Sequence, residues 1–333
     1  MNYSSSFVLS VAGLMVACSG GGGDGGSVSP MATLGIDSSN QGVVAQEAVS
    51  TAFLPLFGAQ TLTGAKTADE SVLFAYARAQ MGKLPAYIAS ASENVVLTGA
   101  VISRTLPCSS GGTLALQVTD IDNNGDLSTG DSVTLSGNNC MEPEGTINGN
   151  LGFVVDSLTG GSFGSSSYSA RMTMAFAGFS IASSQFTGDI AGGLTMSISV
   201  NGVNTESGTL STPSLSVSGT YAGVKRSRNL TNYSATIGRV PSSTYSYLTS
   251  YTASGTLTSS ALASQVISFS TTTPLVSRSN DQYPSGGVLE ITGGGNSRLR
   301  MTALSNTQVK QELDANGDGT YESSSTVNWD TLF

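Results

Sequence analysis

Residues 194–200 have the sequence LTMSISV, and this stretch decides the fold class. Apolar side chains alternate with hydroxyl side chains over all seven positions. Successive side chains of a strand point to opposite faces of a sheet, so this period of two predicts a strand with one apolar and one hydroxyl-bearing face. The same period recurs at 114–118, 215–217 and 309–313.

Turn signals divide the second part of the chain into short strands. Glycine-led starts recur at Gly145, Gly188, Gly208, Gly255 and Gly286. About a dozen strands with short connections and no helices between them favour an antiparallel meander over parallel βαβ units. A long meander must curl or close to hide its edges. We therefore predict a mainly β fold, with an antiparallel β domain over 93–333 that forms a large curved sheet or incomplete barrel; the alternative is a β-sandwich.

A helical segment is predicted over 38–92, before the strands begin. Residues 38–40, Ser-Ser-Asn, are typical of a helix start. Residues 67–70, Thr-Ala-Asp-Glu, match a capping box, in which the first and last side chains satisfy each other's free amides. Apolar residues follow at helical spacing, and we expect Gly82 and Pro85 to end that helix. One or two N-terminal helices should pack on the concave face of the sheet.

Composition excludes several classes of function. The net charge is -9, and Lys and Arg together number 13, so the chain lacks the basic surface that nucleic acids require. Histidine is absent, which excludes a histidine-dependent catalytic triad, a histidine-liganded zinc site and a histidine proton shuttle. We expect no enzymatic activity. A carboxylate-dependent glycan hydrolase or lyase is the alternative that would still be chemically open.

Residues 120–131, DIDNNGDLSTGD, carry oxygen ligands at the spacing of a calcium loop. The candidate ligands are Asp120, Asp122, Asn124, Asp126, Ser128 and Asp131. Ca²⁺ takes six to eight oxygens, and Gly125 would permit the sharp turn that brings them together. The flanking residues have strand patterns, so the loop would close a β-hairpin. The alternative is a solvated Asx-rich turn that needs no ion.

A second loop of this type follows at 314–322, DANGDGTYE. Its candidate ligands are Asp314, Asn316, Asp318, Thr320 and Glu322. Ser325 stands at the twelfth position, where calcium loops carry a strong ligand. The alternative is a plain hairpin turn between 309–313 and 326–329.

The N-terminal apolar run, residues 7–17, is too short to span a bilayer, which needs about 20 residues. It has the length of a signal-peptide core. It ends in LMVAC at 14–18, which resembles the bacterial lipobox, where small residues precede a cysteine that is diacylated and becomes the mature N-terminus. The resemblance implies a signal peptide over 1–17 and a lipidated Cys18 with a flexible tether over 18–37. The alternative is an ordinary cleaved signal peptide with a free cysteine.

The number of cysteines is consistent with an exported chain. The chain has three cysteines, and lipidation of Cys18 leaves Cys108 and Cys140. An even remainder in an oxidising compartment predicts a disulfide, which would stabilise the fold by roughly 3–4 kcal/mol in the chain-entropy model. The alternative is two buried free thiols.

Two clusters have both a binding and a structural interpretation. Tyr245, Tyr247 and Tyr251 share one face of a predicted strand and could stack on sugars, although tyrosines more often cover the edge of a core. Residues 225–228, Lys-Arg-Ser-Arg, could meet phosphates of a lipid or surface polymer, although a solvated loop is the more frequent structure for such a run.

Several motifs together resemble a module of uncharacterised proteobacterial outer-membrane lipoproteins. They are the lipobox, Cys108-Ser-Ser-Gly-Gly-Thr, the DxDxNG and Gly-Asp pairs of 120–131, Cys140, and the tail DxNGDGxYE with Trp329. The resemblance implies an exported chain anchored in the outer membrane by its lipid, on the periplasmic or cell-surface side, and names no activity. We expect a binding or structural lipoprotein, calcium-stabilised, with a lipid or glycan ligand; the alternative is a carrier or chaperone for an apolar ligand.

Overall fold

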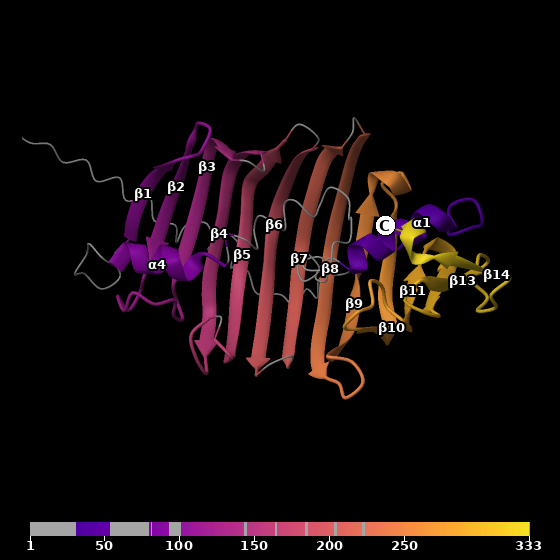
Figure 1. Cartoon of the computed structure of the whole chain (residues 1–333). Coiled ribbons are helices and arrows are strands. Elements are labelled where there is room, and N and C mark those ends of the chain that lie inside the picture. The colour runs from indigo at the N-terminus through magenta and orange to yellow at the C-terminus, as the bar shows by residue number, and fades with distance from the viewer. Residues whose placement is uncertain are drawn as a thin grey trace, which may run out of the picture.

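The computed structural model describes residues 31–53, 80, 82–92, 101–142, 145–163, 165–183, 186–202, 205–221 and 224–332. In these residues, 14 antiparallel strands form one open sheet, and each strand pairs with its neighbours in chain order (Figure 1). The predicted mainly β meander is therefore confirmed. The β-sandwich alternative is wrong, because every strand belongs to the same sheet.

The strands are long in the centre of the sheet and short at its C-terminal end. They are β1 (Val101–Pro107), β2 (Thr113–Thr119), β3 (Ser132–Glu142), β4 (Gly145–Thr159), β5 (Ser167–Ala182), β6 (Phe186–Asn201), β7 (Glu206–Tyr221), β8 (Val224–Pro241), β9 (Tyr247–Ser259), β10 (Val266–Arg278), β11 (Gly286–Thr292), β12 (Arg298–Ala303), β13 (Gln308–Asp314) and β14 (Ser323–Asn328). The described helices are α1 (Gln41–Ala52) and α4 (Leu84–Ser92), with the 3₁₀ turns η3 (Ser260–Leu262), η4 (Gly294–Asn296) and η5 (Trp329–Leu332).

One face of the sheet is apolar, and its side chains line up across the strands. Direct cross-strand partners form a continuous row from β2 to β10: Leu116, Leu135, Leu151, Phe176, Gly192, Leu215, Leu230, Leu257 and Ile267. Apart from Gly192, every member of this row is buried. Burial of a Leu, Ile or Phe side chain stabilises a fold by about 1.5–3 kcal/mol, so this row is a large part of the driving force for the sheet. We call this side the apolar face.

Helix α1 packs on the apolar face near β9 and against η3 and η5, and Figure 1 shows both helices in front of the sheet. A turn closed by the Asp37 carboxylate, which accepts the Ser39 amide at 2.8 Å, precedes the helix. Its side chains Val44, Ala48 and others toward the sheet are fully buried. The predicted helix start at 38–40 is thus close to the observed one, at Gln41.

Helix α4 was not predicted as a separate helix. The capping box at 67–70 lies outside the described residues, so it stays a prediction. Pro85 was expected to end a helix, but it lies in the first turn of α4, which begins at Leu84. Proline fits the first turn because amides there have no partner within the helix. Helix α4 packs on β2 and β3, and neither described helix is long and apolar enough to cross a bilayer.

The segment before α1 belongs to the folded domain. The amides of Thr33 and Leu34 donate to the carbonyl of Val266 at 2.9 and 3.1 Å, and Ile36 is buried. These residues were expected to be the last part of the tether over 18–37. The sheet instead binds them beside Gly293, where a Cβ atom would stand only 2.3 Å from the carbonyl oxygen of Leu34.

Candidate functional site

The first Asp/Asn-Gly loop connects β2 to β3, as the sequence predicts. It brings three carboxylates together: Asp120, Asp122 and Asp131 each place an oxygen within 4.8 Å of the others. Asp120 and Asp131 are buried, whereas Asp122 is exposed. Gly125 adopts φ 77°, the left-handed conformation predicted for the sharp turn, and its amide donates to Asp120 Oδ2 at 3.0 Å.

The remaining candidates of this loop have other roles. Asn124 Oδ1 accepts the Asp126 amide at 2.6 Å, and the Ser128 hydroxyl donates to Asp131 Oδ2 at 3.1 Å. The exposed Asp126 is not among the three grouped carboxylates. Burial is the main cause that raises the pKa of Asp131, and the nearby Asp120 raises it further. This buried pair of negative charges is the arrangement that a divalent cation would stabilise.

The second loop connects β13 to β14 and repeats the geometry of the first. The Gly319 amide donates to Asp314 Oδ2 at 2.9 Å, five residues along the chain as in the first loop, and Gly317 also has φ 77°. Oxygens of Asp314, Asp318 and Glu322 lie within 4.8 Å of one another.

The other two candidates of the second loop lie beside this group. Asn316 Oδ1 accepts the amide of Asp318 at 2.8 Å, and the Thr320 amide donates to Asp318 Oδ1 at 2.7 Å. That amide is the main cause that lowers the pKa of Asp318. The two loops lie toward opposite edges of the sheet, because β2 and β13 are each second from an end in the strand order.

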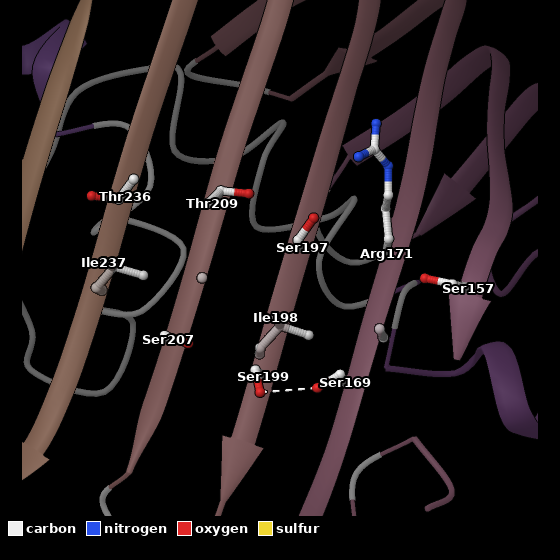
Figure 2. A pocket seen from close by; sticks show the side chains of 12 residues that line it. Ser157, Ser169, Arg171, Ser197, Ile198, Ser199, Ser207, Thr209, Thr236 and Ile237 are labelled. Atoms are coloured by element: carbon white, nitrogen blue, oxygen red, sulfur yellow. Dashed lines mark hydrogen bonds between the residues drawn. The ribbon is translucent and has the colours of Figure 1, made fainter. Parts of the chain in front are cut away.

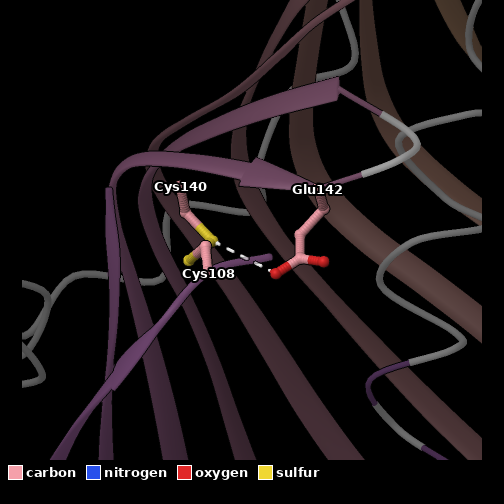
Figure 3. A group of neighbouring side chains, drawn as sticks. All are labelled: Cys108, Cys140 and Glu142. Carbon is pink, nitrogen blue, oxygen red and sulfur yellow. Dashed lines mark hydrogen bonds between the residues drawn. A yellow bond between two sulfur atoms is a disulfide. The ribbon is translucent and has the colours of Figure 1, made fainter. Parts of the chain in front are cut away.

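The predicted disulfide is confirmed. Cys108 and Cys140 are bonded, with their Cα atoms 5.4 Å apart, and the bond ties the end of β1 to β3 across β2 (Figure 3). Glu142 lies beside it and accepts the Ser109 hydroxyl at 2.9 Å. The Glu142 carboxylate is 3.9 Å from Cys140 Sγ. A bridged sulfur has no proton to donate and cannot act as a thiolate, so these groups form a structural cross-link rather than a metal site.

The other sequence candidates divide into buried, half-buried and undescribed positions. Cys18 lies outside the described residues, so its lipidation stays a prediction. Tyr251 is buried, with its ring centroid 5.6 Å from that of Phe53, so it belongs to the core. The guanidinium of Arg239 lies 4.6 Å from the centroid of the Tyr247 ring.

One residue of the basic run at 225–228, Arg228, has a structural role. Arg228 forms two hydrogen bonds with the carboxylate of Glu47 on α1, at 2.7 and 3.0 Å. Lys225 and Arg226 are exposed. The run is therefore not a uniform cationic patch, because its last residue is bonded to the helix.

A hollow of about 450 Å³ lies on the opposite side of the sheet from the helices, across β4 to β8. Figure 2 shows its side chains on neighbouring strands. Its lining hydroxyls belong to Ser157, Ser169, Ser197, Ser199, Ser207, Thr209 and Thr236. Arg171 is the one charged residue among those that line it. The alternation of apolar and hydroxyl residues along each strand predicts a hydroxyl-bearing face. The hollow could not be predicted in this way, because it depends on the register between five neighbouring strands.

Neither the family models, nor the curated proteins, nor the solved structures contain a match to this chain. The functional argument therefore depends on the chemistry of its own residues.

Proposed function

We propose that this chain is an exported lipoprotein without enzymatic activity, anchored in the bacterial outer membrane through a lipid on Cys18. It serves as a binding or structural module, and Ca²⁺ stabilises its carboxylate loops. The observation that carries the proposal is the Cys108–Cys140 disulfide. Disulfides persist in oxidising compartments, and this one uses two of the three cysteines, which leaves Cys18 alone at the end of a short apolar run.

Calcium binding is supported by the grouping of carboxylates at both loops. Asp120, Asp122 and Asp131 supply hard oxygens, the ligands that Ca²⁺ prefers. Each loop is the turn of a β-hairpin, between β2 and β3 or between β13 and β14. A bound ion would therefore hold the conformation of the turn and leave the pairing of the strands unchanged. Extracellular calcium sites bind in the range of about 10⁻⁴–10⁻³ M, which suits ligand sets with few charges.

The lipid anchor is tested by labelling cells with radioactive palmitate. We expect the wild-type chain to incorporate label and to partition into the outer membrane, whereas Cys18→Ser should do neither. Cys108→Ala with Cys140→Ala is the matched control, because it removes cysteines that the proposal does not lipidate and should keep the label. An unlabelled wild-type chain would contradict the proposal.

Calcium binding is tested by thermal melting in millimolar Ca²⁺ and in chelator. At an ion concentration ten times Kd, binding stabilises the fold by about 1.4 kcal/mol, which for a domain of this size raises Tm by about 2–4 °C. Asp122→Asn should reduce this shift by the contribution of the first loop, with little effect on Tm in chelator, since Asp122 is exposed and the second loop keeps its carboxylates. Asp126→Asn is the matched control in the same loop and should retain the shift. Equal Tm values for the wild type in both solutions would remove the ion from the proposal.

A further inference from the structure

The side of the sheet opposite the helices carries rows of hydroxyl groups that cross the strands. Direct cross-strand partners form the longest row on β5 to β10: Thr173, Thr195, Ser211, Ser234, Ser254 and Ser270. A parallel row on β6 to β9 consists of Ser197, Thr209, Thr236 and Thr252. A third consists of Ser169, Ser199 and Ser207 on β5 to β7. We call this side the hydroxyl face.

We propose that the hydroxyl face binds a neutral polysaccharide chain, which lies across the strands in the hollow between β4 and β8. This inference deepens the proposed function, because it names the ligand of the binding module and rests on the chain being such a module.

The spacing of the rows suits a polymer with repeated hydroxyl groups. Neighbouring strands are about 4.7–4.9 Å apart, so the five strands that line the hollow, β4 to β8, span about 19 Å. An extended chain of hexopyranose units advances by about one strand spacing per sugar, and each unit carries hydroxyls that both donate and accept. A hollow of about 450 Å³ is in the size range of small-ligand sites, so it can hold a short run of such units.

The hydroxyls keep capacity for a ligand. Ser169 and Ser199 are hydrogen-bonded to each other at 2.9 Å, and Thr236 and Thr252 at 2.6 Å. Each hydroxyl offers one donor and two acceptor lone pairs, so one such bond leaves sites on both members for solvent or ligand. All four side chains are exposed or half-buried and can reach a chain lying on the face.

Charge favours a neutral ligand. Arg171 is the one charged residue that lines the hollow, and its guanidinium lies 3.7 Å from the carboxylate of Asp156. None of the carboxylates that give the chain its net charge of -9 is among the residues that line the hollow. A polyanion would find a single guanidinium that is already compensated, and a polycation would find no excess of carboxylates.

An apolar ligand fits this surface poorly. Ile198 and Ile237 line the hollow, but they alternate with Ser197 and Thr236 along their strands, so their side chains point to the apolar face. Ile237 packs against the hydrophobic core on that side. The hollow presents hydroxyl groups together with the carbon atoms of the side chains that line it. This mixed surface matches a sugar ring, which has both hydroxyl and CH groups, better than an acyl chain, which cannot hydrogen-bond to the hydroxyls.

The test is a binding titration of the full chain, purified in a zwitterionic detergent that contains no sugar. Cellohexaose and soluble dextran serve as neutral glycan probes, polygalacturonate as the anionic one and lysophospholipid as the apolar one. Calorimetry should detect binding of at least one neutral glycan and weaker or no binding of the other two. Binding of none of the neutral glycans would overturn the proposal, and so would a preference for polygalacturonate or lysophospholipid.

A pair of variants locates the site. Thr209→Val with Thr236→Val removes two adjacent hydroxyls and keeps the shape and strand propensity of both residues. A hydrogen bond contributes about 0.5–1.5 kcal/mol, so losing both should weaken glycan binding by about 5- to 150-fold. Thr220→Val is the matched control, because Thr220 is exposed on β7 beyond the hollow. Equal weakening by the control, or none by the pair, would overturn the location.

The outcomes are independent of the tests of the proposed function. Palmitate labelling and the calcium-dependent Tm do not involve the hydroxyl face, so a chain that is lipidated but binds no glycan would refute this inference alone. A chain that binds glycan through Thr209 and Thr236 but takes no palmitate would refute the lipid anchor and leave this inference standing.

Discussion

The Glu47–Arg228 ion pair makes a sharp prediction about how α1 is held on the sheet. The two residues are 181 positions apart, and their side chains are only 4% and 16% exposed. Burial by itself would raise the pKa of Glu47, but the hydrogen bonds and charge of Arg228 outweigh it, so that pKa lies below its ordinary value. We predict that replacing either residue alone costs far more stability than replacing both.

The magnitude follows from the geometry. At about 4 Å between charge centres and an effective dielectric constant near 20, the attraction is about 4 kcal/mol, and desolvation of the two ions offsets much of it. Removing one partner leaves the other charge buried and unpaired, so Glu47→Leu or Arg228→Met should each cost about 3–5 kcal/mol. The double variant replaces the pair with apolar side chains and should lose only about 1–2 kcal/mol, far less than the sum of the single losses.

The assay is urea unfolding followed by the fluorescence of the single tryptophan. Trp329 reports on α1 docking, because its ring centroid lies 6.1 Å from that of Phe53 at the end of the helix. Replacing Arg171, whose ion pair with Asp156 is largely exposed at 60% and 32%, is the control and should cost less than about 1 kcal/mol. Additive losses in the double variant would refute the reasoning.

The same pair predicts a pH dependence with a defined sign. The pKa of Glu47 is lower in the folded chain than in the unfolded chain, so its contribution is present above the ordinary value of 4.5 and is lost as pH falls through the folded pKa. Acid should therefore lower the Tm of the wild type more than that of the double variant. Identical acid sensitivity of the two proteins would contradict this assignment.

Three further predictions concern single features of the fold. Replacing Cys108 and Cys140 with serine releases a cross-link with a sequence separation of 32 and should cost about 3–4 kcal/mol in urea unfolding, matched by reduction of the wild type. Gly317→Ala should cost about 1–3 kcal/mol, because the residue has φ 77° and its new Cβ would stand 2.3 Å from the carbonyl oxygen of Gly295; an unchanged unfolding midpoint would refute the strain. Tyr233→Phe removes the hydroxyl that donates to the last carbonyl of α1 at 3.2 Å and should cost about 1 kcal/mol, measured by the same Trp fluorescence; no loss would mean that the hydroxyl has no net role.

The strands and their order could be predicted from the sequence, because the relevant information is local. Alternation at 194–200 determines which side chains share a face, and short glycine-marked turns make sequence neighbours pair. The end of a helix is harder to predict. Pro85 is compatible with both the end of one helix and the first turn of the next, and the turn before it decides between them.

The candidate site was predictable in composition but not in detail. The spacing of 120–131 indicated a turn rich in oxygen ligands, yet it gave Asp126 the same standing as Asp122. The structure separates them, because the backbone path turns one carboxylate toward Asp120 and leaves the other outside the group. The rows of the hydroxyl face depend on register between strands, and bulges such as the shift between Gly192 and Thr195 set that register without any local signal.

The exclusive pairing of sequence neighbours has a consequence for how such a molecule is assembled and how its size can change. Each strand finds its partner in the strand made just before it, so the sheet can grow in the order in which the polypeptide emerges, with no segment threaded between two others. A hairpin can also be gained or lost at a turn without rewiring the remainder, much as a unit is added to a solenoid. The disulfide-bonded edge at β1 to β3 and the edge at β14, next to Trp329, would then cap the two ends of the sheet, and the number of strands between them could vary.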